Sequence, residues 1–396
     1  MKNIYVYSSS GNADTFLGTI YVDKIRGNET YSFEFDSKAL ESGAGSLLCD
    51  AELLPMLGRQ HKSDPHLPYH FMSDSSPDRW GRSLLNKKMG NKALFESEYL
   101  LGVSDVSRMG ALRYKTDKDG PFLAETEDIP PFRFLRELED AAHSFDEYSL
   151  DPKWISLLAP GSSLGGARPK ATIYDVDGTV CLAKFSAIKD SLDYPSIEYW
   201  TYLLAKEAGI DIMPSRIIRF ENGRSVFITK RFDREGAMRI HYASFMTILN
   251  ANDGESSSYT YLDMADAVTR LSAKPKEDLK QLFLRIAFSL FVHNYDDHLR
   301  NHAMIRRGNT WNLSPAFDLN ISLDKAALTM TIDGTESSLN SLINAAPFFG
   351  LSVEMGQHIV DGMRNKLKGS FEKTAKLAGI NKSLQDTAYR ILEDLH

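Results

Sequence analysis

The segment HNYDDHLRNHAMI, residues 293–305, carries a high density of groups that bind protons and metals. Two acids, three histidines and two asparagines fall within its first ten residues, and Asp296 lies five positions before Asn301. A carboxylate can accept the proton of an attacking hydroxyl, and an amide oxygen can hold a Mg²⁺ ion on a phosphate. This pair of groups on one short loop suits phosphoryl transfer, but each group alone is common, and the prediction depends on further parts in the right order.

Other segments could supply the rest of a phosphate site. Asp318 in SPAFDL, a short predicted hairpin further on, would be a second carboxylate for Mg²⁺. The glycines of GSSLGGARPK, residues 161–170, allow backbone N–H groups to approach a phosphate. Lys184 ends the apolar strand CLAKF, and Glu198 lies near the start of the next helix. These parts follow one another in the order found in protein kinases, where the glutamate orients the lysine.

Each of these groups also has an ordinary structural explanation. A glycine-rich stretch can simply join two elements, a strand lysine can reach solvent, and an acid in the first turn of a helix suits the helix dipole. The histidines are spaced by five and four residues, which is not a zinc motif, and no cysteine lies nearby. We expect His298 to orient the loop through a hydrogen bond, and His293 and His302 to be structural. We expect Asp297 to be solvated or to cap the loop, although it could replace Asp296 as the base.

The periodicity of the chain predicts the elements that carry these groups. Alternating apolar residues predict strands in the first 35 residues and near 107–114, and hairpins around the Asp177-Gly178 and Asn222-Gly223 turns. The segment FMSDSSPDRWGRSLL is expected to be a polar loop. A helix should begin after an N-cap at Ser196 and stop at Gly209. After Asp233 the pattern is mostly helical, with strands or a short hairpin expected in ISLDKAALTMTIDG.

The composition limits the class of protein. The chain has 396 residues, 42% of them hydrophobic and 25% charged, and a net charge of −7, which argues against nucleic-acid binding through overall charge. Cys49 and Cys181 do not form a CxxC pair and are expected to be reduced. The N-terminus has no signal-peptide core, and no apolar run approaches the roughly 20 residues of a membrane span. We therefore expect a cytoplasmic protein that makes no membrane contact.

Taken together, the motifs resemble the HipA family, the serine/threonine kinases of bacterial toxin–antitoxin pairs. The catalytic loop of that family looks like DxHxKN, and here it is DDHLRN, with arginine at the lysine position. SLGGARPK is similar to the family's serine-containing phosphate loop, ITKRFDR to its hinge and PAFDL to its metal-binding segment. FMSDSSPDRWGR is similar to a family loop usually closer to LPDGWGR, and SRMGALRY to another. The resemblance covers nearly the whole chain.

The resemblance implies an α+β, two-lobed, protein-kinase-like fold. Its β-rich N-terminal lobe would include a HipA-type subdomain, residues 1–120, and a kinase core, residues 121–235 with the glycine-rich loop and the hinge. Residues 236–396 would form the all-α C-terminal lobe with the catalytic loop. Asp318 is followed by leucine rather than Phe-Gly, and the chain has no long activation loop with an APE motif. Regulation by the flip of a DFG segment is therefore not expected.

The resemblance also implies roles for individual residues. Asp296 would be the catalytic base, assisted by Lys184 and His298, and Asn301 and Asp318 would bind Mg²⁺. The residues expected to contact ATP are Ser162, Ser163, Gly165, Gly166, Lys184, Glu198, Lys230 and Phe232. Ser163, with the adjacent Ser162 as the alternative, matches the serine that this family can autophosphorylate. A phosphate there would repel the phosphates of ATP, so we expect it to switch the enzyme off.

The implied activity is transfer of the γ-phosphate of ATP to a protein serine or threonine, which would arrest growth or cause persistence. The expected partners are a helix-turn-helix, HipB-like antitoxin, DNA only through that antitoxin, and a substrate such as an aminoacyl-tRNA synthetase or another translation factor. Two alternatives remain. One is a small-molecule kinase of the aminoglycoside-phosphotransferase type, and the other is a catalytically silent co-repressor that binds the antitoxin.

Overall fold

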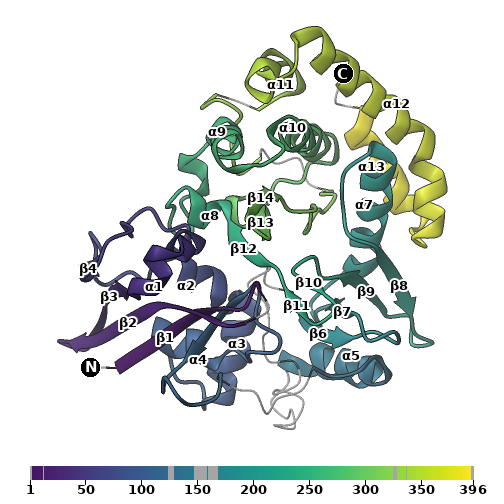
Figure 1. Ribbon diagram of the computed structural model, residues 1–396. Helices are drawn as coiled ribbons and strands as arrows, with labels where there is room; N and C mark the ends of the chain where they lie inside the picture. Colours follow the sequence, from purple (N-terminus) through teal and green to yellow (C-terminus); the bar gives the residue numbers. More distant parts are fainter. Residues whose placement is uncertain are drawn as a thin grey trace. The chain divides into compact units, whose positions relative to one another are not determined.

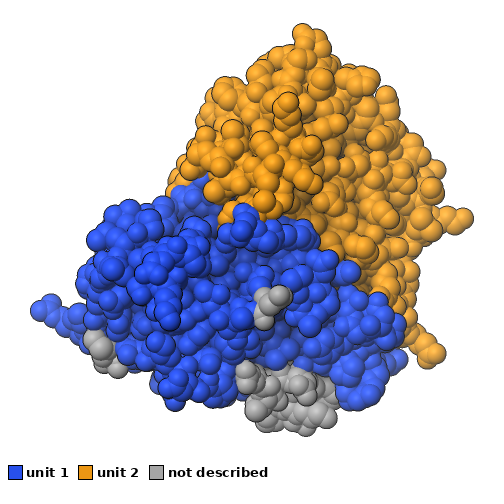
Figure 2. Space-filling model, viewed as in Figure 1, with its two compact units in different colours: residues 1–188, 230–251, 305–309 blue, residues 189–229, 252–304, 310–396 orange. Residues whose placement is uncertain are grey.

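The computed structural model describes residues 2–11, 13–123, 129–146, 158, 168–323, 328–335 and 337–393. The chain divides into two compact units (Figure 2). The first unit contains residues 1–188, 230–251 and 305–309, and the second contains residues 189–229, 252–304 and 310–396. Strands dominate the N-terminal part and helices the C-terminal part (Figure 1), so the predicted α+β class is confirmed. The division into three subdomains at residues 120 and 235 stays a prediction.

The first unit is built around a five-stranded antiparallel sheet in the order β4-β3-β2-β1-β5. Figure 1 labels β1 to β4 of this sheet. Its strands are β1 (Lys2–Ser8), β2 (Thr15–Ile25), β3 (Asn28–Phe35), β4 (Arg59–His61) and β5 (Leu112–Lys115). Arg26 and Gly27 both have positive φ, which is the geometry of a tight two-residue hairpin between β2 and β3. Alternate strand residues such as Ile4, Val6 and Phe33 are buried in the core of this unit.

Short helices and small hairpins complete the first unit. The helices are α1 (Ser37–Glu41), η1 (Ala44–Leu48), α2 (His70–Ser75), α3 (Arg79–Lys88), α4 (Glu96–Gly102), η2 (Phe132–Phe134), α5 (Leu135–His143), η3 (Ser144–Asp146) and α8 (Phe245–Ile248). The further strands are β6 (Lys170–Tyr174), β7 (Val180–Phe185), β10 (Arg234–Glu235), β11 (Met238–Arg239) and β12 (His241–Ser244). The β6–β7 hairpin turns at Asp177-Gly178, as predicted.

The second unit is mostly helical. Its helices are α7 (Tyr194–Ala208), η4 (Ser256–Ser258), α9 (Tyr261–Leu271), α10 (Pro275–Val292), η5 (Leu299–Asn301), α11 (Leu339–Asn344), η6 (Ala346–Phe349), α12 (Val353–Leu377) and α13 (Lys382–Glu393). Its strands are β8 (Ser215–Arg219), β9 (Ser225–Lys230), the start of β13 (Ala303–Arg307) and β14 (Thr310–Leu313). The helices of the described residues include none with both the length and the apolar character to cross a membrane.

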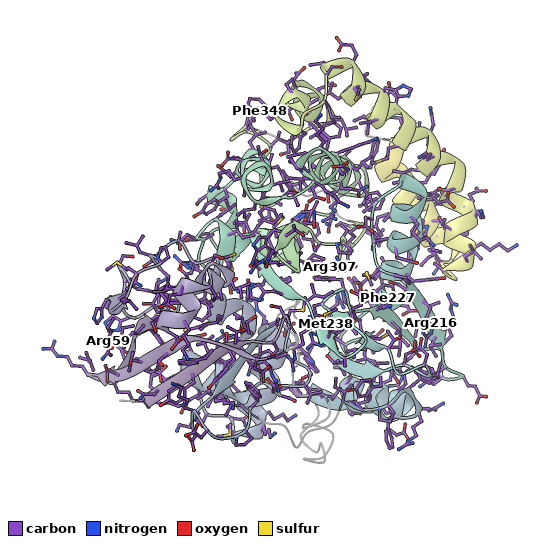
Figure 3. All side chains as sticks on the ribbon, viewed as in Figure 1. Arg59, Arg216, Phe227, Met238, Arg307 and Phe348 are labelled. Atoms are coloured by element: carbon purple, nitrogen blue, oxygen red, sulfur yellow. The ribbon has the colours of Figure 1, made fainter. Side chains whose placement is uncertain are left out.

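Helix α7 is held on two sides within the second unit. Its Trp200 donates a hydrogen bond to Thr374 of α12 at 3.1 Å and meets the ring of Phe371 edge-on. On the β8–β9 hairpin, Phe227 (labelled in Figure 3) lies 6.5 Å from the ring centroids of both Tyr199 and Tyr202. Helix α7, which carries Glu198, therefore has a fixed place relative to α12 and to this hairpin.

The structure corrects two expectations about how helices begin. The segment FMSDSSPDRWGRSLL is not a loop, because it forms α2 and most of α3. Buried Phe71, Met72 and Trp80 stabilise these helices, and Asp78 caps α3 by accepting a hydrogen bond from the Gly81 N–H at 2.8 Å. Helix α7 begins at Tyr194 rather than after Ser196. Its end is as predicted, with Gly209 in the left-handed conformation.

The structure also corrects the expected extent of several strands. The strand expected near 107–114 covers only Leu112–Lys115. The region after Asp233 contains the short strands β10 to β14 as well as helices. In 321–334 the described residues form no strand beyond an isolated bridge between Thr331 and Thr260, and 324–327 lie outside the described ranges. Such short strands carry too few residues for a detectable alternation.

Candidate functional site

The loop that carries Asp296 and Asn301 begins where the apolar helix α10 ends. His293 adopts a left-handed conformation with φ 52°, which stops the helix and turns the chain. Two tight backbone hydrogen bonds follow, from Tyr295 N–H to the His293 carbonyl at 2.7 Å and from Asp297 N–H to the Asn294 carbonyl at 3.1 Å. Because the last two turns of α10 are fully buried, the start of the loop is anchored in the core of the second unit.

The side chain of Asn301 reaches back across this loop. Its amide N–H donates to the Asp296 carbonyl at 3.0 Å, and its backbone N–H donates to the His298 carbonyl at 2.8 Å. Asn301 is buried, yet its Oδ1 has no hydrogen-bond partner within the described residues. The Asp296 side chain is exposed. The loop thus offers one accessible carboxylate and one oriented amide oxygen, both hard oxygen donors that suit Mg²⁺.

The neighbouring acid, Asp297, has the opposite environment. It is 1% exposed and accepts hydrogen bonds from Tyr261 at 2.6 Å, Ser289 at 3.1 Å and His302 at 2.8 Å. Burial alone would raise the pKa of Asp297, but the charge of His302 and these hydrogen bonds outweigh it and lower the pKa below its usual value. Burial and the charge of Asp297 raise the pKa of Tyr261 well above its ordinary range. The expectation that Asp297 is solvated is therefore wrong.

The histidines of the loop differ from one another. His302 is buried and bonded to Asp297, which agrees with the structural role expected for it. His298 is partly buried, and its Nδ1 has no hydrogen-bond partner within the described residues. Its backbone carbonyl holds Asn301 instead. The proposed part of the His298 ring in catalysis stays a prediction.

The segment that carries Asp318 is bonded to the start of the loop that carries Asp296 and Asn301. Asn320 N–H donates to Asn294 Oδ1 at 3.4 Å, and Ser322 N–H donates to the Val292 carbonyl at 3.0 Å. Asp318 itself is partly buried and adopts a left-handed conformation with φ 57°, which is uncommon for a residue other than glycine. These bonds bring the two segments expected to bind Mg²⁺ together within the second unit.

Helix α7 is hydrogen-bonded to the segment that carries Asp318. Thr201 Oγ1 accepts a hydrogen bond from the Ile321 N–H at 3.0 Å, three residues after Asp318. Glu198 lies one turn before Thr201, so the two residues share a face of the helix. The partly buried Glu198 is therefore on the face of α7 that meets the Asp318 segment.

Lys184 belongs to the first unit, where it lies on β7 directly opposite Lys170 of β6. Two like charges in opposite positions of a sheet destabilise it unless one is compensated. Lys170 is buried, and its Nζ lies 2.6 Å from Asp78 Oδ2. This ion pair compensates Lys170, while Lys184 remains partly exposed. Because Lys184 and Glu198 belong to different units, their predicted pairing stays a prediction.

The expected hinge, residues 228–234, is fixed by a buried ion cluster in the first unit. Asp233 accepts from Arg231 at 2.8 and 2.7 Å, from Arg234 at 2.5 Å and from the Gly110 N–H at 2.7 Å. Burial favours a raised pKa for Asp233, but the two guanidinium charges outweigh it and hold the pKa far below its usual value. Phe232 is buried and Lys230 is exposed. The backbone expected to contact adenine therefore has a rigid support.

The expected phosphate loop, with Ser162, Ser163, Gly165 and Gly166, lies outside the described residues. The described ranges hold no cluster of three or more histidine, cysteine, aspartate or glutamate side chains suited to a metal ion. Mg²⁺ bound to a nucleotide commonly takes only one or two protein carboxylates and fills its other positions with phosphate and water. Asn301 and Asp318 are compatible with such a site.

Sequence reasoning missed the partners of Asp297. Tyr261 and Ser289 lie 36 and 8 residues before it, on two different helices. No local spacing indicates that α9, α10 and the loop meet at one carboxylate. Only the five-residue spacing from Asp297 to His302 could have suggested part of the network.

Comparisons with known proteins show the family and the fold of this chain. The family model described as HipA-like C-terminal domain matches residues 162–375, more than half of the chain. A curated protein of Sinorhizobium fredii named "Putative kinase Y4mE" is 27% identical over 175 residues. That match spans 40% of this chain and 41% of the Sinorhizobium protein.

Among solved structures, a chain of the Shewanella oneidensis MR-1 HipA, HipB and operator DNA complex superposes with a TM-score of 0.71 and 16% identity. The match covers 99% of this chain and 95% of that chain. The Helicobacter pylori proinflammatory kinase CtkA matches over 58% of this chain and 88% of its own, with a TM-score of 0.45 and 12% identity. The family match, together with the residues that it spans, shows that this chain belongs to the HipA-like C-terminal domain family.

Proposed function

We propose that this protein is an ATP- and Mg²⁺-dependent protein serine/threonine kinase. The observation that carries the proposal is the geometry of the loop at 294–302. Asp296 has an exposed carboxylate, and the buried amide oxygen of Asn301 has no hydrogen-bond partner within the described residues. The side-chain N–H of Asn301 donates to the backbone carbonyl of Asp296 at 3.0 Å, which links the two residues across the loop. Membership of the HipA-like family and the likeness to a protein named as a kinase support the same activity.

In the proposed reaction, Asp296 accepts the proton of the attacking serine or threonine hydroxyl. Asn301 and Asp318 would hold Mg²⁺, which when bound neutralises charge on the transferred phosphoryl group. Lys184 would contact the ATP phosphates and Glu198 would orient it, while the backbone at Lys230 and Phe232 would accept the adenine. The lowered pKa and burial of Asp297 argue for Asp296 as the base, because a base must reach the proton that it removes.

We further propose that the kinase is the toxin of a toxin–antitoxin pair, with a HipB-like antitoxin as its partner. Support comes from the fold shared with a chain of the Shewanella HipA, HipB and operator DNA complex. DNA would be reached only through the antitoxin, which agrees with the net charge of −7. The protein substrate would be an aminoacyl-tRNA synthetase or another translation factor, and its phosphorylation would arrest growth or cause persistence. Phosphorylation of Ser163 on the glycine-rich loop would switch the enzyme off.

The test is transfer of labelled γ-phosphate from ATP to the protein itself and to proteins of a bacterial lysate. Asp296→Asn keeps the size of the side chain but removes the base, so we expect label in the wild type and a loss of about 100-fold or more in the variant. The matched control is Asp266→Asn, which removes an exposed acid on α9 whose ion pair within the described residues is with Arg270, one turn away. Its rate should equal that of the wild type.

Other outcomes distinguish the alternatives. Equal labelling by the wild type and Asp296→Asn would exclude Asp296 as the base. ATP consumption with a small-molecule acceptor but no labelled protein would favour the aminoglycoside-phosphotransferase type of kinase. Label that persists on the protein in a Ser163→Ala variant would exclude Ser163 as the autophosphorylation site and point to Ser162.

A further inference from the structure

The buried network around Asp297 joins three elements to the catalytic loop. Tyr261 is the first residue of α9, Ser289 lies in the last turn of α10, and His302 begins the chain that leaves η5. All three donate to one carboxylate, and each of the four residues is at most 2% exposed. The Asp297 carboxylate therefore anchors the loop at one buried point.

Asp297 lies between the two loop residues expected to act on the substrate, so anchoring it affects both. The bond from His302 to Asp297 closes the segment 298–301 into a short ring, and Asn301 is the last residue inside that ring. Asp296 immediately precedes the ring, and its carbonyl accepts the bond from Asn301. Anchoring Asp297 in the core thus restrains both the exposed carboxylate before it and the amide oxygen after it.

The chemistry of the network requires a carboxylate at position 297. Tyr261 and Ser289 both donate to Oδ2, while His302 donates to Oδ1. An asparagine has one acceptor oxygen and one NH₂ group, so with the NH₂ facing His302 the ring would have to accept at Nε2 and carry its proton on Nδ1, which has no hydrogen-bond partner within the described residues. A buried donor without an acceptor costs free energy, and the loop would leave this geometry to relieve it.

We propose that Asp297, with Tyr261 and His302, forms a clamp that positions Asp296 and Asn301 for phosphoryl transfer. The clamp residues do not touch substrate; they act through the two loop residues that do. This inference rests on the proposed kinase activity, and it adds to that activity a requirement for a second acid next to the base. Because the acting groups must align with the substrate, a small shift of the loop should slow the reaction while nucleotide binding persists.

The first test measures kcat and the KM for ATP in Asp297→Asn and in the milder Tyr261→Phe, both corrected for the fraction of folded protein. We expect kcat to fall by about 10-fold or more in Asp297→Asn and by less in Tyr261→Phe, with a smaller change in KM. His302→Gln, which keeps an N–H donor, should retain more activity than His302→Leu. A kcat for Asp297→Asn equal to that of the control variants would overturn the clamp.

The first unit offers matched controls. Glu29 is a buried carboxylate that accepts from Tyr31 at 2.5 Å and from the hydroxyl and N–H of Ser97 at 2.6 and 3.2 Å. Glu29→Gln and Tyr31→Phe therefore make the same chemical changes in a network outside the catalytic loop. They should lower stability without lowering kcat per folded molecule. A fall in kcat equal to that of the clamp variants would show that the loss comes from general destabilisation and would overturn the proposal.

A second test does not depend on kinase activity. Arg300 lies inside the ring closed by the clamp, and its side chain is only 14% exposed. Trypsin should cut after Arg300 faster in Asp297→Asn than in the wild type, and no faster in Glu29→Gln. Unchanged cleavage at Arg300 in Asp297→Asn would overturn the clamp. If the wild type transfers no phosphate but this cleavage pattern appears, the kinase proposal fails while the clamp on the loop stands.

Discussion

Asp296 and Asp297, two adjacent acids in the loop after α10, show that residue type alone does not determine the environment of a side chain. Asp296 is exposed and Asp297 is 1% exposed, although both are aspartates in the same loop. The difference arises because Tyr261 and Ser289 on two helices, together with His302 at the end of the loop, donate to Asp297 and compensate its charge in the core. A buried carboxylate with satisfied hydrogen bonds has a structural use, whereas an exposed one can exchange protons with a substrate.

A buried histidine in the first unit gives a prediction about acid stability. Burial lowers the pKa of His241 to about 4, despite the hydrogen bond of its Nε2 with the Leu47 carbonyl. The unfolded chain binds a proton below a pH of about 6.5, while the folded chain does not until about 4, so stability falls as the pH drops through this window. Between pH 7 and pH 5 we expect this residue to remove about 2 kcal/mol from the free energy of unfolding.

Urea unfolding at both pH values would measure this effect. His241→Gln keeps a donor for the Leu47 carbonyl but cannot titrate, so it should lose about 2 kcal/mol less than the wild type on acidification. His358→Gln, which changes an exposed histidine on α12, should lose as much free energy of unfolding on acidification as the wild type. If the wild type and His241→Gln lose the same free energy of unfolding between pH 7 and pH 5, His241 does not control acid stability.

At the scale of elements, helix caps connect local structure to the candidate site. Asp78 caps α3 through the Gly81 N–H and at the same time pairs with the buried Lys170 of β6. The indole N–H of Trp80, in the first turn of α3, donates to the Lys170 carbonyl at 3.0 Å. The start of α3 therefore fixes the strand that lies opposite Lys184, the expected phosphate lysine.

Removing the Asp78 side chain should lower the free energy of unfolding by more than the loss of an ordinary helix cap does. Asp78→Ala removes the carboxylate that lies 2.6 Å from the buried Lys170 Nζ, so we expect the free energy of unfolding to fall by about 3–5 kcal/mol. The control is Asp36→Ala at the start of α1, where, among the described residues, the carboxylate accepts hydrogen bonds from the backbone N–H groups of Lys38 and Ala39. A loss of about 1 kcal/mol is expected. Chemical denaturation of the two variants measures the difference. Equal losses would mean that the ion pair with Lys170 adds no stability.

At the scale of the whole molecule, residues far apart in the chain support one another. Arg231 donates to the Ser107 carbonyl at 2.6 Å and to Thr172 at 3.2 Å, and Asp233 holds the Gly110 N–H. Three segments of the first unit thus meet beneath the expected hinge. Buried charges of this kind must be fully paired, because an unpaired one destabilises the fold by several kcal/mol.

Ligand binding should therefore be visible in the stability of the entire chain. ATP with Mg²⁺ at about 100 times the dissociation constant should stabilise the native state by about 2.7 kcal/mol, and chelation of Mg²⁺ should remove part of this gain. Asn301→Ala should weaken the Mg²⁺-dependent part, whereas Asn309→Ala, an exposed residue after β13, should not. Thermal unfolding with and without ATP and Mg²⁺ measures the stabilisation of the wild type and of each variant. A wild type that ATP and Mg²⁺ do not stabilise would favour the silent co-repressor.

The sequence by itself determined those features that depend on neighbouring residues. The Asp296–Asn301 spacing, the apolar helix before it, the Asp177-Gly178 turn and the stop at Gly209 each involve a few consecutive residues. Their backbone preferences and periodicity act over one or two turns, so the pattern is visible in the chain. The family resemblance rested on the same short motifs, and the match over residues 162–375 confirmed it.

Only the tertiary structure decided which polar groups are buried and what compensates them. Asp297 differs from Asp296 because α9 and α10 bring Tyr261 and Ser289 to it, and Asp78 is bonded to Lys170 across 92 residues of chain. The free energy of a buried charge depends on partners within hydrogen-bond distance, and packing rather than spacing in the sequence selects those partners. The loop expected at 71–85 became two helices for the same reason, since burial of Phe71 and Trp80 stabilises what local polarity does not indicate.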